Sequence, residues 1–205
     1  MITVCIMSYK YGHLVAHAIE SVLGQTIKPH RIIVVDDGIG DCSIAKDYGV
    51  ELIARPENLG IVENFNQTLN LVTTNKVLFL GADNWLRPDA LEKMNSFDAD
   101  IVSSDIALFG TEAREFAQGK NTVYENGHYT WRFSPGNIEN GNYIHGSSLY
   151  NAELAKKVGG YKPSGNKNSE EDWMLWREMM RNGAKHAHIN EPLLFYRRHI
   201  NNFQK

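Results

Sequence analysis

Short apolar runs alternate with segments of helical periodicity through the first hundred residues. Four such runs, two of them rich in valine and isoleucine, span residues 2–7, 31–35, 51–54 and 76–80. Short runs of this kind are typical of strands that are buried on both faces of a sheet. Between them, apolar side chains recur at helical spacing over residues 14–23 and 62–72. The alternation predicts an α/β fold of Rossmann-like type, with a mostly parallel central sheet flanked by helices.

The pattern changes after about residue 104. Residues 113–142 are rich in polar, glycine and aromatic residues, with turn signals at Pro135-Gly136 and Asn140-Gly141. We expect this segment to leave the sheet as a hairpin or a long loop. Helices are predicted over residues 151–158 and 170–182, and a last strand over residues 193–196.

Composition and charge narrow the function classes. The chain has 205 residues, 42% of them hydrophobic, which fits one globular domain. A formal net charge of −3 leaves no large basic field, so no nucleic-acid partner is expected. Two cysteines, Cys5 and Cys42, are too few for a disulfide framework and fit a reducing compartment. The apolar N-terminal run is too short for a signal peptide or a membrane span, so we expect a soluble, cytoplasmic protein.

Polar side chains follow three of the predicted strands. They stand in the segments Ser8-Tyr9, Asp36-Asp37-Gly38 and Gly81-Ala82-Asp83-Asn84. The carboxyl ends of parallel strands meet at one edge of a sheet, where ligands bind in such folds. Carboxylates there can accept hydrogen bonds from a base or ribose, or hold a divalent cation. The alternative is structural, because Asp-Asp-Gly is also a turn signal and Asp83-Asn84 could precede a helix beginning near Pro88.

Two further segments carry both a functional and a structural interpretation. Asn58-Leu59-Gly60 opens a predicted helix that bears Asn66, so these residues either line a nucleotide pocket or cap the helix. Glu171 and Asp172 begin the helix of residues 170–182, so either could serve as a general base or simply favour the helix dipole. The dipole lowers the pKa of a carboxylate and burial raises it, and the sequence leaves that balance open.

Three histidines near the C-terminus are candidate metal ligands. His199 follows Tyr196-Arg197-Arg198, although a lone histidine is usually a surface residue. His186 and His188, two residues apart, share one face if that segment is a strand. A metal site at this pair is the minor alternative.

Taken together and in order, these segments resemble the family 2 glycosyltransferases of the GT-A fold. The matching stretches are IMSY (6–9), SVLGQT (21–26), VVDDG (34–38), NLG (58–60), FLGADNWLRPD (79–89), GGY (159–161), EDWMLW (171–176) and YRRH (196–199). They cover nearly the whole chain. The resemblance implies one GT-A domain over residues 1–205, in which residues 1–104 bind a nucleotide sugar and residues 105–205 bind the acceptor.

The resemblance also implies roles for the donor-side residues. Tyr9 and Asp37 fall where the family stacks and hydrogen-bonds the nucleotide base. The other residues that it places around the nucleotide are Ser8, Asp36, Asn58, Asn66 and Ala82. Asp83 matches the last acid of the family's Asp-x-Asp signature, which reaches the metal, and His199 falls where many members bring a histidine to that metal.

On the acceptor side, Asp172 matches the carboxylate that acts as catalytic base in inverting members, and Glu171 is the second candidate for that role. Gly146 and Ser147 are expected to line the acceptor side, together with two tryptophans that could stack on sugars. These are Trp131 and Trp173, for which plain core packing is the alternative.

The chain departs from the family pattern at three positions. Gly81 stands in place of the first acid of the signature, Lys10 replaces the usual asparagine, and Met7 replaces a common proline or threonine. Metal binding therefore depends on Asp83, His199, the diphosphate and water, a donor set that suits Mg²⁺ or Mn²⁺.

The activity that the resemblance implies is metal-dependent, inverting transfer of a hexosyl or pentosyl group from a nucleotide sugar, UDP-sugar first, to a hydroxyl of a glycan or other acceptor. Association with a membrane would come only through that acceptor. One alternative is a non-catalytic nucleotide- or sugar-binding module, which the loss of the acid at Gly81 favours. A retaining transferase is another alternative. A nucleotidyltransferase would need a basic, glycine-rich loop after the first strand, which Tyr9-Lys10-Tyr11-Gly12 matches poorly.

Overall fold

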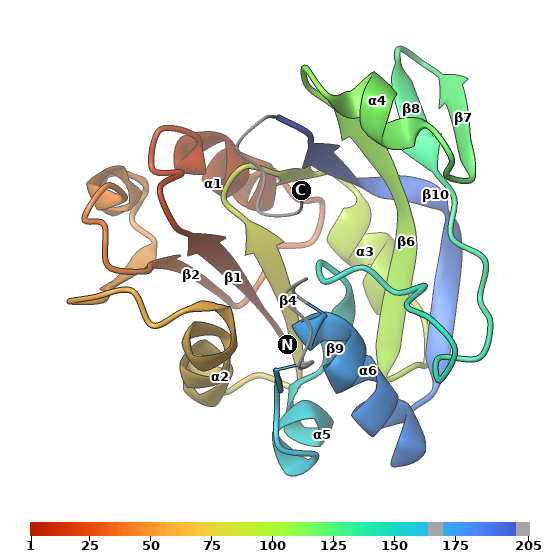
Figure 1. Ribbon diagram of the computed structural model, residues 1–205. Coiled ribbons are helices and arrows are strands. Elements are labelled where there is room, and N and C mark those ends of the chain that lie inside the picture. Colours follow the sequence, from red (N-terminus) through yellow and green to blue (C-terminus); the bar gives the residue numbers. More distant parts are fainter. Residues whose placement is uncertain (164–169, 200–205) are drawn as a thin grey trace.

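A parallel half-sheet forms the N-terminal part of the molecule (Figure 1). The computed structural model describes residues 1–163 and 170–199. The parallel strands lie in the order β3-β2-β1-β4, with bounds β1 Ile2–Ser8, β2 Arg31–Asp36, β3 Glu51–Ala54 and β4 Lys76–Gly81. All four predicted strands are confirmed. Three of them extend one residue beyond their apolar run, so that Ser8, Asp36 and Gly81 end the strands at the predicted polar edge.

Helices cover both faces of this sheet. The core on one face joins α1 (Val15–Leu23) and α3 (Ala90–Asn95) to strand residues such as Val4 and Ile6. The core on the other face joins α2 (Ile61–Leu71), α5 (Ala152–Lys157) and α6 (Glu171–Arg181) to residues such as Cys5 and Met7. In Figure 1, α2, α5 and α6 lie together below the sheet and α1 lies above it. Alternate residues of β1 therefore face two separate hydrophobic cores, as expected for a strand buried on both sides.

The C-terminal half continues the same sheet with mixed strand directions. The full order is β3-β2-β1-β4-β9-β6-β10-β5, and β9 runs antiparallel to both of its neighbours. The strands are β5 (Trp85–Leu86), β6 (Ile101–Phe109), β9 (Leu149–Asn151) and β10 (His186–Arg197). The mostly parallel arrangement thus holds for the first half, while β9 reverses direction in the second.

The predicted excursion contains a hairpin. Strands β7 (Thr122–Glu125) and β8 (His128–Trp131) pair with each other, and β8 also pairs with β6. Helix α4 (Ala113–Ala117) precedes the hairpin, and a 3-10 helix, η1 (Ser43–Tyr48), follows β2. Within the described residues, no helix combines the length and apolar character that a membrane crossing needs.

Strand β6 was missed in the sequence because polar residues interrupt its apolar run. Ser103, Ser104 and Asp105 are buried in its middle. Two histidines of β10 bind the first and last of them: the Oγ of Ser103 lies 2.8 Å from His186 Nε2 and 2.9 Å from His188 Nδ1, and His188 Nε2 lies 3.0 Å from Asp105 Oδ1. The Ser104 hydroxyl donates to the Asp105 carbonyl at 2.8 Å. His186 and His188 do share one face, but this network uses three of their four ring nitrogens. The boundary expected at residue 104 also falls inside β6, so the two halves share a strand.

Candidate active site

A cavity of about 980 Å³ opens at the carboxyl ends of β1 and β4, where the polar strand ends were predicted to meet. Six of the predicted site residues line it: Ser8, Tyr9, Asp37, Asn58, Asp83 and His199. They come from five separate parts of the chain, and the parallel topology of β1, β2 and β4 brings the first, second and fourth strand ends together. The rule that ligand sites form at strand ends therefore located this cavity from sequence.

Asp37 is fixed at the edge of the cavity. Its backbone N–H donates to the Ser8 carbonyl at 2.9 Å, and its Oδ1 accepts the Leu59 N–H at 3.0 Å. Gly38 makes this approach possible, since it has a φ of +81° and a Cβ there would lie 2.2 Å from the carbonyl carbon of Glu57. Asp37 is 4% exposed as a residue, so its side chain is held in one place, and within residues 1–163 and 170–199 no hydrogen bond is made to Oδ2.

Tyr9 presents a half-open aromatic ring to the cavity. Its exposed fraction is 38%, which is high for a large apolar side chain at a strand end. The Lys10 ammonium lies 4.8 Å from the ring centroid, and Lys10 itself has a φ of +67°, unusual for a residue other than glycine. A ring and a cation therefore stand side by side at this wall of the cavity.

Three predicted nucleotide-site residues have structural contacts instead, outside the cavity lining. Asp36 accepts the backbone N–H groups of the loop that follows it, from Ile39, Gly40 and Cys42. Asn66 exchanges two hydrogen bonds with the backbone of Tyr161. Ala82 is buried in the core, and its N–H donates to the Met7 carbonyl. The polar groups of these three residues are used within the protein, so their contact with a nucleotide stays a prediction.

Asp83 and His199 are the strongest candidates for metal ligands among the described residues. The Asp83 Oδ2 and His199 Nε2 atoms lie 3.5 Å apart at the cavity wall. Two ligand atoms about 2.1 Å from one ion stand about 3 to 3.5 Å from each other, so the pair fits a shared cation. Burial raises the pKa of Asp83, and the neighbouring His199 and Arg197 oppose that rise. Carboxylate oxygen with a single imidazole suits Mn²⁺ or Mg²⁺ chemistry with water and substrate as further ligands.

A second acidic cluster fits a metal less well. The possible ligand atoms of Asp36, Asp41 and Cys42 lie within 4.8 Å of one another. However, the Asp36 carboxylate already accepts three N–H groups, and Asp41 accepts the Gly12 N–H at 3.0 Å. Burial raises the pKa of the Cys42 thiol to about 12, so it stays protonated. The hydrogen bonds of this cluster stabilise the loop after β2 and occupy the carboxylates that would bind a metal.

Asp172 is the most perturbed carboxylate on the acceptor side. It stands at the start of α6, and its Oδ1 accepts the Trp173 N–H at 2.6 Å and the Asn142 amide at 3.3 Å. Burial raises the pKa of Asp172 to about 7, the Glu171 charge adds to the rise, and these hydrogen bonds oppose it. Burial therefore outweighs the helix start, which answers the question the sequence left open. Burial also raises the pKa of Glu171, whose Oε2 has no hydrogen-bond partner among the described residues.

Gly146 lies directly against the Asp172 carboxylate. A Cβ built on Gly146 would stand 3.5 Å from Asp172 Oδ2, so the missing side chain leaves that oxygen uncovered. Ser147 follows in the same turn and is half-buried. The turn is held below by Ser148, whose hydroxyl donates to the His145 carbonyl at 2.7 Å. Gly146 therefore lies beside the candidate base, with Ser147 next to it in the chain.

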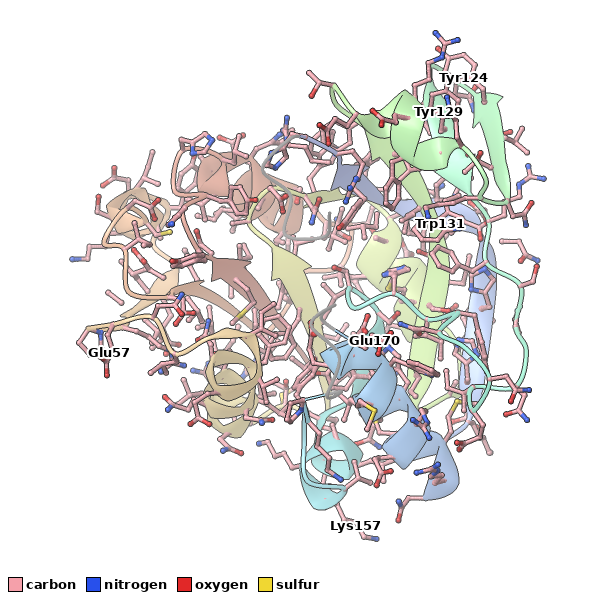
Figure 2. The ribbon with its side chains drawn as sticks, in the orientation of Figure 1. Glu57, Tyr124, Tyr129, Trp131, Lys157 and Glu170 are labelled. Atoms are coloured by element: carbon pink, nitrogen blue, oxygen red, sulfur yellow. The ribbon has the colours of Figure 1, made fainter. Side chains whose placement is uncertain are left out.

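The two tryptophans are partly buried, pack against the core and are not among the described residues that line the cavity. Trp173 donates from Nε1 to the Ile138 carbonyl at 2.7 Å and packs against the core of α5 and α6. Trp131 stacks on Phe133 with ring centroids 4.6 Å apart, on the β8 side of the sheet (Figure 2). Core packing, the alternative to sugar stacking, is what their contacts show.

Tyr196 connects the donor and acceptor sides. It lies near the end of β10, and burial raises the pKa of its hydroxyl, to which the charges of both Asp83 and Asp172 add. The charges of both carboxylates therefore act on the same hydroxyl. Sequence reasoning missed Tyr196, and it also missed Asn142 and Arg197. The signal for two of them was their position directly before His199.

Solved structures of low sequence identity share this architecture. The crystal structure of S. aureus TarS 1-349 in complex with UDP-GlcNAc matches with a TM-score of 0.75 and 17% identity, over 98% of this chain and 60% of that one. The mannosyltransferase PcManGT from Pyrobaculum calidifontis, in complex with GDP-Man and Mn²⁺, matches with a TM-score of 0.64 and 17% identity, over 93% of this chain and 54% of that one. The fold is the GT-A fold that the sequence resemblance implied.

The sequence relationship is equally clear. The model of glycosyl transferase family 2 matches residues 3–159, so the chain belongs to that family. The glycosyltransferase GlyA of Streptococcus pneumoniae is 32% identical over 118 residues, which make up 53% of this chain and 17% of that protein. The chain spans less than two thirds of the length of each of these relatives.

Proposed function

We propose that this chain transfers a sugar, with inversion, from a nucleoside diphosphate sugar to a hydroxyl of a glycan or other acceptor, using a divalent cation. The observation that carries the proposal is the cavity at the strand ends, where Asp83 and His199 lie 3.5 Å apart and which the Tyr9 ring and the fixed Asp37 carboxylate also line. Asp83 lies at a cavity with a ring and a fixed carboxylate, and Asp172 is a poised base beside an uncovered turn. The related structures TarS with UDP-GlcNAc and PcManGT with GDP-Man and Mn²⁺ support this type of donor.

In the proposed donor complex, the base stacks on the Tyr9 ring and Asp37 Oδ2 accepts a base N–H. Oδ1 of Asp37 is already held by the Leu59 N–H, so the carboxylate needs no reorganisation to bind. Uracil offers one ring N–H for such an acceptor, which makes a UDP-sugar the first candidate. Guanine also offers N–H donors, so GDP belongs in the same test.

Asp83 and His199 would hold the cation, together with diphosphate oxygens and water. When bound, the cation supplies Lewis-acid stabilisation of the charge that develops on the departing diphosphate. The protein itself contributes by holding the Asp83 side chain in position. Arg197 donates from Nε to the Asp83 carbonyl at 3.1 Å and keeps the turn in place.

Asp172 is the proposed base. Because Trp173 and Asn142 hold Oδ1, Oδ2 is the oxygen that takes the proton of the acceptor hydroxyl as the new glycosidic bond forms. A pKa of about 7 places the carboxylate near the pH at which a general base works best. One base acting on the face opposite the leaving diphosphate gives a single displacement, and hence inversion.

The first test is thermal unfolding with UDP, GDP and dTDP, each with and without Mn²⁺ or Mg²⁺. A ligand that binds only the folded chain raises the unfolding midpoint by mass action. We expect a metal-dependent rise with one nucleotide, followed by release of that nucleotide from its sugar donors in a turnover assay. Binding without turnover of any donor would favour the non-catalytic module. No shift with any nucleotide at millimolar concentration would contradict the donor site.

A further inference from the structure

The turn after β4 carries the proposed metal ligand and is tied closely to the sheet. Gly81 ends β4 opposite Met7 of β1. The Ala82 N–H donates to the Met7 carbonyl at 2.9 Å, and the Asn84 N–H closes the turn onto the Gly81 carbonyl at 3.0 Å. The backbone of the turn is therefore fixed, and only the side chains of Asp83 and Asn84 are left to adjust.

Those two side chains fold back over Gly81. A Cβ at Gly81 would stand 2.7 Å from Asn84 Nδ2 and 2.9 Å from Asp83 Oδ1. Non-bonded atoms in a packed protein do not come this close, so any side chain at residue 81 would move both groups. Both contacts are with the tips of flexible side chains rather than with backbone. A larger residue at position 81 would therefore displace Asp83 and Asn84 and leave the fold intact.

Asp83 and Asn84 in turn hold the strand end that bears His199. Asn84 Oδ1 accepts the Arg197 N–H at 2.8 Å, and the Asp83 carbonyl accepts from Arg197 Nε at 3.1 Å. The Asp83 carboxylate lies 3.5 Å from His199 Nε2. Displacing the two side chains thus disturbs the carboxylate and the imidazole together.

We propose that Gly81 is a positioning residue for the metal: its missing side chain lets the Asp83 carboxylate fold back against His199, so that the pair is set for one divalent cation. This inference rests on the proposed function. The acid that the resembled signature has at this position suggests that Gly81→Asp would add a ligand and tighten metal binding. The contacts predict the opposite, because the Cβ of an aspartate at residue 81 enters the space that Asp83 Oδ1 occupies.

The test measures UDP affinity by calorimetry with and without Mn²⁺, and Mn²⁺ occupancy by electron paramagnetic resonance. The variants are Gly81→Ala and Gly81→Asp, with Gly136→Ala as the matched control, since a Cβ at Gly136 meets nothing within 4 Å. We expect the metal-free UDP affinity to stay within about twofold of wild type. The Mn²⁺-dependent gain should fall about tenfold or more in both Gly81 variants, as for other residues that orient a metal ligand, and stay unchanged in the control.

Two further variants test the inference even if the Gly81 variants fold poorly. Asn84→Ala creates no clash but releases the Arg197 N–H, so it should lower the Mn²⁺-dependent gain in the same direction. In an Asp83→Asn background, Gly81→Ala should add no further loss, because the two residues act through one carboxylate. Additive losses would overturn the inference.

The outcomes separate the inference from the function on which it rests. If Gly81→Asp binds Mn²⁺ and UDP more tightly than wild type, or Gly81→Ala matches wild type, the positioning role is wrong while the donor site stands. If wild type shows no metal-dependent gain with any nucleotide, the proposed function fails and takes the inference with it.

Discussion

Two candidate carboxylates, Asp83 in the first half of the molecule and Asp172 in the second, differ in what surrounds them. Burial raises the pKa of both Asp83 and Asp172. Beside Asp83 stand the His199 ring and the Arg197 guanidinium, which oppose the rise, whereas beside Asp172 stands Glu171, which adds to it. The first environment favours a charged metal ligand and the second a base that exchanges a proton near neutral pH. Neighbouring charge, rather than residue type, separates the two proposed roles.

The halves also place their carboxylates by different means. Asp83 stands at the end of a buried strand, and the backbone of its turn is hydrogen-bonded to β1. Asp172 stands at the start of a helix, where its Oδ1 accepts the Trp173 N–H and the side-chain amide of Asn142 from a distant loop. The donor side is therefore positioned by sheet topology and the acceptor side by individual side-chain contacts. A substitution on one side should therefore change either metal binding or proton transfer and leave the other unchanged.

The largest separation is expected from Asp172→Asn. Asparagine keeps the Oδ1 acceptor for Trp173 and Asn142 but cannot take a proton at the position of Oδ2. We expect kcat for donor turnover to fall by about 10²- to 10⁴-fold, the usual contribution of a general base, while Mn²⁺-dependent UDP affinity is unchanged. Glu153→Gln, at an exposed carboxylate in the first turn of α5, is the matched control. A rate within tenfold of wild type would assign the base elsewhere.

The next effect is the converse one, from Asp83→Asn. Loss of the carboxylate should reduce Mn²⁺ affinity in the presence of UDP by about 10- to 100-fold, with little change in metal-free UDP binding. Titration of Mn²⁺ against a fixed UDP concentration measures this directly. If Asp83→Asn and Asp172→Asn lower the Mn²⁺ affinity equally, the two carboxylates do not have the different roles proposed here.

The contrast between positioning by sheet topology and positioning by side-chain contacts also explains which site residues could be predicted from the sequence. Ser8, Asp37 and Asp83 were found because each follows a buried strand, and the ends of parallel strands meet at one edge. Asp36 and Asn66 do not line the cavity, and the sequence could not show this because a strand or helix position does not reveal the direction of a side chain. One points back into its own loop and the other binds Tyr161, 95 residues along the chain. Such contacts between distant segments leave no local pattern in the sequence.

The acceptor half was harder for a related reason. Its strand β6 is buried yet carries Ser103 and Asp105, which hydrogen-bond with histidines of β10 more than 80 residues later. Hydrophobic patterning assumes that buried positions are apolar, so it misses a strand whose polar groups pair with one another. The role of Asn142 at Asp172 was hidden in the same way, inside a segment that was predicted only as an excursion.

A smaller effect should follow from Glu171→Gln, which removes the like charge next to the proposed base. Without that charge, the pKa of Asp172 falls from about 7, because the neutral form of Asp172 loses part of its advantage. The acidic limb of the pH profile of kcat/KM should therefore move down by up to about one unit, which raises the activity at pH 6. An unmoved limb would mean that Glu171 does not influence Asp172, and a loss as large as that of Asp172→Asn would make Glu171 the base.

The smallest effect concerns stability and pH. A carboxyl whose pKa is raised on folding contributes stability below its unfolded pKa, and that contribution is lost as the pH rises through the folded value, about 7 for Asp172. Asp172→Asn removes this loss, so its unfolding midpoint should exceed that of wild type by about 2–4 °C at pH 8 and by clearly less at pH 5. Asp83→Asn should gain less at pH 8, since His199 and Arg197 already offset the burial of that carboxylate. Equal gains from both variants in calorimetric scans would show that neighbouring charge does not distinguish the two carboxylates, whereas the expected inequality would measure the difference without any substrate present.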